Sequence, residues 1–151
     1  MIVSKLVLPE EVHSLREFRQ RELPGFATVN IALQAFEFKA LFPWHLSVLI
    51  RYVDCIEHRL PSDDEQKLLY SFEGRLDPLI KANNNALFLA RVTHDCFREI
   101  IWRVRDPDAV DAVLRQILSN KDYRREFDYR IDDDPKWEKA AWHLGSRPTA
   151  H

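Results

Sequence analysis

The stretch 60–131 constrains the fold of this chain most, because each of its elements is marked by its own boundary residues. Its first helix begins at a capping box, in which the Ser62 hydroxyl accepts a free backbone amide and the Glu65 carboxylate reaches back to the cap. Pro78 should kink this helix or end it early. Apolar residues recur at the three-to-four spacing of one buried helical face: Leu68, Leu69, Phe72, Leu76, Leu79 and Ile80.

Two strands, a second helix and a third strand are expected next. Residues 86–93 and 97–104 are rich in β-branched and aromatic side chains, and a short hairpin connection separates them. The second helix opens on Asp106 as N-cap and Pro107 at its first position, where a missing amide costs nothing. Apolar residues alternate with charged ones from 127 to 131, which is typical of a strand with one buried face.

The segments on either side complete the fold prediction. Alternating apolar residues from 46 to 52 indicate a strand before the capping box, which gives the βαββαβ order of a ferredoxin-like α+β sandwich. An additional strand is expected at 26–38, with no assigned place in the sheet, and an N-terminal helix from Pro9 that Pro24-Gly25 breaks. A short helix should start at Lys136. We therefore expect one domain, with an extension at 1–25, a core at 26–144 and a frayed tail at 145–151.

Composition narrows the class of protein. The 151 residues carry a formal net charge of −2, so nothing drives the chain as a whole toward nucleic acid or an anionic membrane. No apolar segment approaches the roughly 20 residues that span a bilayer. Cys55 and Cys96 form no Cys-x-x-Cys pair, which favours reduced thiols in a cytoplasmic protein. We expect no cofactor, no membrane association and no direct nucleic-acid binding.

Two places invite a catalytic hypothesis. His94, Asp95 and Cys96 include a possible nucleophile and base, but neighbouring residues on a tight turn rarely point at each other, so a connective turn is favoured. The run from Asp132 to Asp134 could gather a divalent cation, although a solvated acidic turn with Asp134 capping the last helix is favoured. The histidines lack the spacing of a zinc site, so no metal is expected. The alternative function from these places is a small hydrolase using the Cys96 hairpin or the acidic turn.

Residues 60–144 resemble the bacterial domain-of-unknown-function family 695, whose fold is similar to that of the regulator of ribonuclease activity B. The residues that carry the resemblance are Leu60-Pro61-Ser62, Glu65, Glu73, Arg91-Val92-Thr93, Arg98-Glu99, Asp134-Pro135-x-Trp137 and Leu144. The family tends to have glycine in the hairpin turn where this chain has Cys96, which implies a different turn or some strain. The resemblance implies no enzyme class and a distant kinship to a ribonuclease inhibitor that acts by binding.

Two features suggest how such a protein would bind a partner. The loop 36–44 is rich in aromatic residues; core packing is the default reading, and an exposed cluster would be a binding patch. Acidic residues near 63 and 132 suit helix N-termini, and they would also steer association with a basic protein. We expect a non-catalytic protein-binding domain, an inhibitor such as a toxin-neutralising immunity protein or a ribonuclease regulator. The expected partner-binding residues are Phe36, Phe38, Phe42, Trp44, Asp63, Asp64, Asp132 and Asp133.

Overall fold

A computed structural model describes residues 6–145, and within them six antiparallel strands form one sheet in the order β1-β2-β4-β5-β3-β6. The strands are β1 (His13–Gln20), β2 (Leu23–Asn30), β3 (Trp44–Arg51), β4 (Ala86–His94), β5 (Phe97–Val104) and β6 (Phe127–Asp133). The helices are α1 (Asp63–Lys81), α2 (Pro107–Ser119) and the short α3 (Ala141–Leu144). The predicted α+β class is confirmed.

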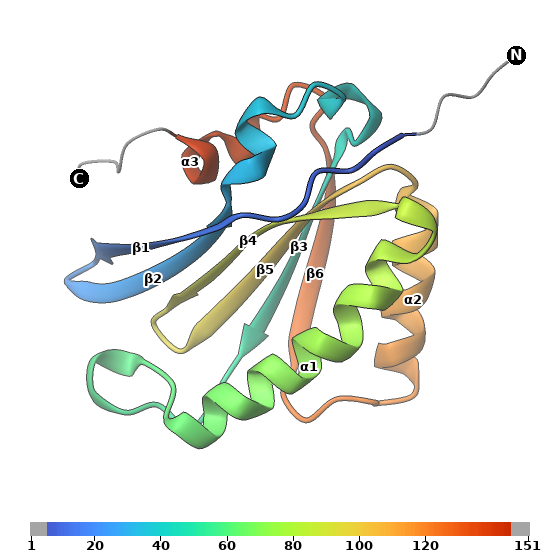
Figure 1. Ribbon diagram of the computed structural model, residues 1–151. Coiled ribbons are helices and arrows are strands. Elements are labelled where there is room, and N and C mark those ends of the chain that lie inside the picture. The colour runs from blue at the N-terminus through green and yellow to red at the C-terminus, as the bar shows by residue number, and fades with distance from the viewer. Residues whose placement is uncertain (1–5, 146–151) are drawn as a thin grey trace, which may run out of the picture.

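The two long helices lie over one face of the sheet (Figure 1). The predicted helical faces are confirmed at their centres, since Phe72 on α1 is 9% exposed and Leu114 on α2 is fully buried. Leu79 instead points to solvent. The expected early end at Pro78 is wrong, because α1 continues to Lys81. The carbonyl that loses its amide donor belongs to Gly74, which is exposed, so water can satisfy it.

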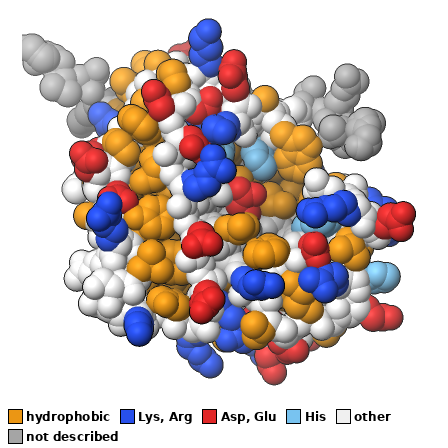
Figure 2. All heavy atoms as spheres, turned by 180° about the vertical axis from the view of Figure 1, so that it is seen from behind, with side chains coloured by type: hydrophobic (Ala, Val, Ile, Leu, Met, Phe, Trp, Pro, Cys, Tyr) orange, Lys and Arg blue, Asp and Glu red, His pale blue; other side chains and the backbone are white. Residues whose placement is uncertain are grey.

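The opposite face of the sheet has a second apolar core of its own. Leu87, Leu89 and Ile101 of the sheet pack there against residues from the loops and the C-terminal segment. The partners that cover them are Leu33, Phe36, Phe42, Trp137 and Ala140. Figure 2 shows acidic, basic and hydrophobic side chains interspersed over this side of the molecule. No single sign of charge dominates the view, so this side has no obvious field to steer a charged partner.

The predicted N-terminal helix is wrong, because residues 13–20 form strand β1, which pairs with β2. The spacing of Val12, Leu15 and Phe18 suggested a helix, but in the strand Leu15 is 69% exposed and Phe18 packs on the second core. The turn between these strands uses Arg21 and Glu22, both at positive φ. Residues 1–5 of the predicted extension, and all of the predicted tail except Gly145, lie outside the described residues.

The additional strand predicted at 26–38 is partly right. Strand β2 ends at Asn30, and Ile31–Ala35 form a 3-10 turn instead. The Asn30 side chain explains the ending: its Oδ1 accepts from the amides of Val12 (3.1 Å) and Ala32 (3.3 Å), and its Nδ2 donates to the Phe88 carbonyl (2.9 Å). Because β2 pairs with β4, the β1–β2 hairpin extends the sheet beyond β4, so that β4 and β5 are its two middle strands.

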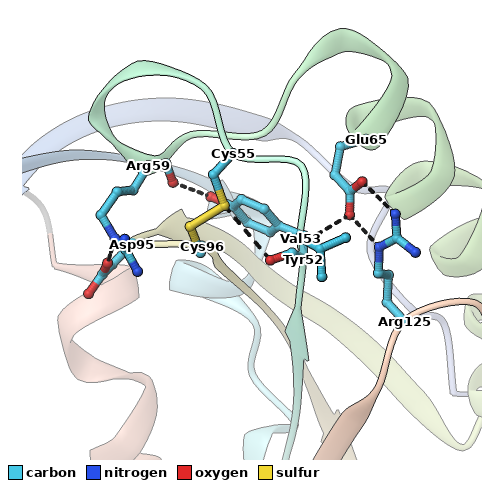
Figure 3. Close-up of a disulfide and its surroundings, with 8 residues drawn as sticks. All are labelled: Tyr52, Val53, Cys55, Arg59, Glu65, Asp95, Cys96 and Arg125. Carbon is cyan, nitrogen blue, oxygen red and sulfur yellow. Dashed lines mark hydrogen bonds and ion pairs between the residues drawn. A yellow bond between two sulfur atoms is a disulfide. The ribbon is translucent and has the colours of Figure 1, made fainter.

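The start of α1 follows the predicted capping box in one half only. The Glu65 amide donates to the Ser62 hydroxyl at 3.1 Å, as predicted. The Glu65 carboxylate does not reach back to Ser62. It accepts from the Val53 amide at 3.2 Å and from Arg125 Nε and Nη2 at 2.6 and 2.8 Å (Figure 3). Glu65 therefore ties the helix to the strand end before it and to the segment before β6.

Candidate functional site

The face of the sheet that carries α1 continues past this helix into the β1–β2 hairpin, where neither long helix lies over it (Figure 1). A cavity opens at this face between α1 and the start of β1. We call the uncovered face, together with the adjoining side of α1, the α1–hairpin groove. The strand register aligns Leu15, Thr28 and Arg91 across one row, and Phe26 beside Thr93 in the next. The groove comprises these strand residues and one side of α1: Leu15, Phe26, Thr28, Arg91, Thr93, Tyr70, Glu73 and Gly74.

The groove brings together residues that carry the family resemblance. Arg91 and Glu73 form a two-pronged ion pair, with Nε to Oε1 at 2.7 Å and Nη2 to Oε2 at 2.6 Å. Burial disfavours the charged form of Arg91, but hydrogen bonding to Glu73 outweighs it and raises the pKa of the guanidinium. This planar pairing fixes both side chains between β4 and α1, so the floor and wall of the groove are joined rigidly.

Arg98 lies beside this pair and is 1% exposed. Its Nε donates to the Thr93 hydroxyl at 3.0 Å and its Nη2 to Gln66 Oε1 at 2.6 Å. Its Nη1 has no hydrogen-bond partner among residues 6–145, and burial lowers the pKa of the guanidinium. A buried charge without a carboxylate is costly, so stability alone does not account for Arg98.

Tyr70 covers both guanidiniums from the α1 side. The guanidinium carbons of Arg91 and Arg98 lie 5.1 and 4.9 Å from the centre of the Tyr70 ring, which is within cation–π range. Tyr70 is nevertheless 48% exposed, and Leu15 across the groove is 69% exposed. The two side chains therefore offer apolar surface to solvent beside fixed positive charge.

One end of the groove deepens into a cavity of about 250 Å³ between α1 and the start of β1. Lys81 is held there by Glu11 at 2.7 Å and Asp77 at 2.9 Å. Gly74 also lines the cavity, and a Cβ added to it would meet nothing within 4 Å. Glycine inside a helix costs about 0.5–1 kcal/mol relative to alanine, so packing within the protein does not explain Gly74.

The motif Asp134-Pro135-x-Trp137 has a structural role on the other face of the sheet. Arg103, fully buried, donates from Nη1 to Asp134 Oδ2 at 2.8 Å and from Nη2 to the Asp134 carbonyl at 2.6 Å. Its guanidinium carbon lies 4.5 Å from the centre of the Trp137 ring. The Asp134 carboxylate also accepts from the amides of Glu138 and Lys139. These two amides belong to the 3-10 turn Glu138–Ala140, and no side chain caps α3, so the expectation that Asp134 caps the last helix is wrong.

Two titration shifts accompany this cluster. Burial acts against the charged form of Asp134, but Arg103 and the two amides outweigh it and lower the pKa of the carboxyl. Burial and the nearby Arg103 lower the pKa of His45 to about 4. His45 is therefore neutral near pH 7, and its Nδ1 can accept from Arg103 Nη1 at 3.0 Å. The cluster holds a single buried ion pair with no second positive charge from the histidine.

The predicted acidic residues do not form one surface. Asp132 pairs with Arg130 at 3.2 Å, and Asp133 is exposed opposite Trp44 at the start of β3. Asp63 and Asp64 begin α1, beyond the other end of β3. Within residues 6–145, no three acidic, histidine or cysteine side chains are placed to hold a metal ion. The expected acidic turn at 132–134 is wrong for Asp132 and Asp133, which end strand β6, while Asp134 follows the strand and is buried.

The predicted aromatic patch is mainly core. Phe36 is 9% exposed and Phe42 fully buried, both in the second core. Trp44 is half-buried against the core under α1 and α2. Phe38 is 51% exposed. The default reading of this loop as core packing is confirmed for Phe36 and Phe42.

Cys55 and Cys96 form a disulfide, which contradicts the expectation of two reduced thiols (Figure 3). The expectation failed because the sulfur atoms are brought together by the loop after β3 and the β4–β5 turn, 41 residues apart in sequence. Asp95 and Cys96 both take positive φ, as in the type I′ turns that usually carry glycine. The Cys96 amide donates to the Arg59 carbonyl at 3.0 Å, so the same loop supports the turn.

The other turn residues point away from the cysteine sulfur. His94 Nε2 lies 2.8 Å from the Gln20 carbonyl oxygen, and its ring stacks on Phe18. The Asp95 carboxylate accepts from Arg59 Nε. Each residue of the predicted nucleophile-and-base set thus has a different neighbour in the fold.

Reducing the disulfide, or replacing both Cys55 and Cys96 with serine, should lower the free energy of unfolding by about 2–4 kcal/mol. The bond removes conformations from the unfolded chain by closing a long loop. Urea melts with and without reductant measure the loss. Equal midpoints in the wild type under both conditions would mean that the two sulfurs are not bonded in solution, and the serine variant controls for effects of reductant itself.

The fold and its groove define a small α+β domain. The chain belongs to the family of unknown function DUF695, whose sequence profile matches residues 21–140. No curated protein and no solved structure matches the chain. Within residues 6–145, no helix is long and apolar enough to cross a membrane.

Sequence reasoning did not find Leu15, Phe26, Tyr70 or Gly74 as site residues. Two signals were present: a glycine inside an otherwise regular helical pattern, and a tyrosine outside the apolar face of that helix. Neither signal shows which part of the chain lies beside this side of the helix. Only the placement of the β1–β2 hairpin beside β4 turns them into one side of a groove.

Proposed function

We propose that this chain is a non-catalytic protein-binding domain and that the α1–hairpin groove is its binding face. The observation that carries the proposal is the pair of exposed side chains, Leu15 and Tyr70, on either side of half-buried Phe26. Protein interfaces draw most of their energy from a few apolar or aromatic anchors within a polar rim. Here the fixed charges of Arg91, Glu73 and Lys81 supply such a rim.

The sharper form of the proposal is an inhibitor, such as a toxin-neutralising immunity protein or a ribonuclease regulator. The ion pairs that join α1 to the sheet support it, because a rigid preformed groove loses little conformational entropy on binding.

We also propose that the hairpin extends a ferredoxin-like unit, which consists of β3, α1, β4, β5, α2 and β6. The strand order β4-β5-β3-β6 and the βαββαβ element order support this assignment.

The contacts of the candidate catalytic residues favour binding over the hydrolase alternative. Cys96 shares its sulfur with Cys55, and Asp134 is engaged by Arg103 and two amides. The cytoplasmic location stays a prediction. It is linked to the redox state of the cysteine pair, because lasting disulfides are typical of oxidising compartments and cytosolic ones are usually transient.

The proposal is tested by capturing partners from the native host with the tagged chain and measuring kinetics with the purified partner. Leu15→Asp and Tyr70→Ala should each speed dissociation and weaken affinity by about tenfold or more, since anchor truncation costs about 2 kcal/mol. Leu49→Ala, an exposed position on the opposite face, serves as the matched control. Hydrogen exchange in the complex should protect residues 13–20 and 70–77. A complex insensitive to both groove variants would overturn this placement.

A further inference from the structure

A second cleft opens on the other side of α1, between this helix and the segment that leads into β6. Its volume is about 400 Å³. Its apolar lining comes from partly exposed Leu68 and from the buried residues Phe72, Leu69 and Ile50, and Ser71 adds a hydroxyl. The charged side chains are four cations and one acid: Lys67, Arg75, Arg124, Arg125 and Asp64. We call it the basic cleft. It shares no lining residue with the α1–hairpin groove, and it is independent of the function proposed above.

Two of the four cations are fixed in place by carboxylates. Arg125 forms the two-pronged pair with Glu65, and this hydrogen bonding lowers the pKa of the Glu65 carboxyl. Arg75 reaches Asp122 Oδ2 at 3.0 Å, and its guanidinium carbon lies 5.9 Å from the Phe72 ring centre. These pairs hold guanidinium groups at the cleft and neutralise their charge in part.

The other two cations lack such partners. Within residues 6–145, neither Lys67 nor Arg124 forms an ion pair with a carboxylate. They come from different elements: Lys67 from the second turn of α1, and Arg124 from the segment between α2 and β6. The cleft therefore places two uncompensated positive charges and two oriented guanidiniums around an apolar floor, against the single carboxylate of Asp64.

We propose that the basic cleft binds a small organic phosphate, a phosphate monoester carried on a flat apolar body. A phosphate monoester has a charge of about −1.5 to −2 at pH 7, which matches the two unpaired cations. Guanidinium groups bind phosphate oxygens through paired hydrogen bonds. The apolar body would cover Leu68 and the exposed part of Phe72, and Asp64 would accept from a hydroxyl or amino group of the ligand. Cavities of this size are within the range that holds small molecules.

The test is titration of the full-length chain with adenosine monophosphate, followed by isothermal calorimetry and by amide chemical shifts. We expect saturable binding that weakens with added salt, with shifts concentrated at residues 64–75 and 122–126. Inorganic phosphate should bind at least about tenfold more weakly, because it leaves the apolar floor uncovered. The double variant Lys67→Gln with Arg124→Gln should lose about tenfold or more, since charged hydrogen bonds are removed while no ion pair is broken.

Arg105→Gln with Arg130→Gln is the matched control, because it removes two exposed cations elsewhere and should change affinity less than about twofold. Thermal melts show that each variant folds. Three results would overturn the proposal: no shifts at millimolar nucleotide, an equal loss in the control, or inorganic phosphate binding as tightly as the nucleotide. The last result would leave a bare anion site with no role for the apolar floor.

Discussion

Replacing Asp134 with alanine should lower the free energy of unfolding by about 3–5 kcal/mol, the cost of leaving a buried charge without its partner. Arg103 would stay fully buried with His45 as its remaining side-chain acceptor, and that histidine is neutral near pH 7. The amides of Glu138 and Lys139 would also lose their acceptor. Urea-induced unfolding followed by fluorescence and circular dichroism measures the effect.

Asp132→Ala is the matched control for this experiment. Asp132 lies two residues earlier, in strand β6, and pairs with Arg130, whose side chain is 73% exposed. Its loss should cost less than about 1 kcal/mol, as is usual for surface ion pairs. If Asp134→Ala cost no more than Asp132→Ala, the Arg103–Asp134 pair would not be the anchor of the C-terminal segment.

Phe72→Ala and Leu114→Ala should each cost about 2–5 kcal/mol, because each removes a large side chain from the core between the helices and the sheet. Phe72 packs on Phe127, with ring centres 5.4 Å apart, and Leu114 on α2 is fully buried. Leu79→Ala on α1 is the control, since Leu79 is 50% exposed. Losses below about 0.5 kcal/mol for both core variants, which is the range of surface substitutions, would contradict the assigned helix faces.

Most helices and strands of the stretch 60–131 could be predicted from the sequence, because the residues that mark their ends act locally. Ser62 caps α1 through a contact three residues away, and Asp106 caps α2 through a contact two residues away. The N-terminal region was misread because its apolar residues are divided between two sheet faces, so Leu15 and Phe18 mimic a helical repeat. Local spacing cannot separate these cases when neither face is continuously apolar.

The candidate site was less predictable, because its parts meet only through tertiary contacts. The family-like residues Glu73, Arg91 and Arg98 were recognised in sequence, but their convergence depends on α1 crossing β4 and β5. The prediction of two reduced cysteines failed for the same reason, because no residue near Cys55 in the sequence indicates that the turn with Cys96 lies beside it. The Glu65 carboxylate is a smaller example: the capping motif predicted its sequence position but not its partner, Arg125.

The central claim is that the α1–hairpin groove binds another protein. Partner affinity and protein stability measured together on Gly74→Ala test this claim most directly. The added methyl meets no atom of the protein, so alanine should stabilise α1 by about 0.5–1 kcal/mol. In the groove that methyl would occupy space needed by a close-fitting partner, and we expect affinity to fall by about tenfold or more. Ser71→Ala, on the basic-cleft side of the same helix, is the control and should leave binding unchanged. A Gly74→Ala variant with undiminished affinity would contradict the claim. Gly74 would then be explained by Pro78, four residues later, which leaves the Gly74 carbonyl without an amide donor.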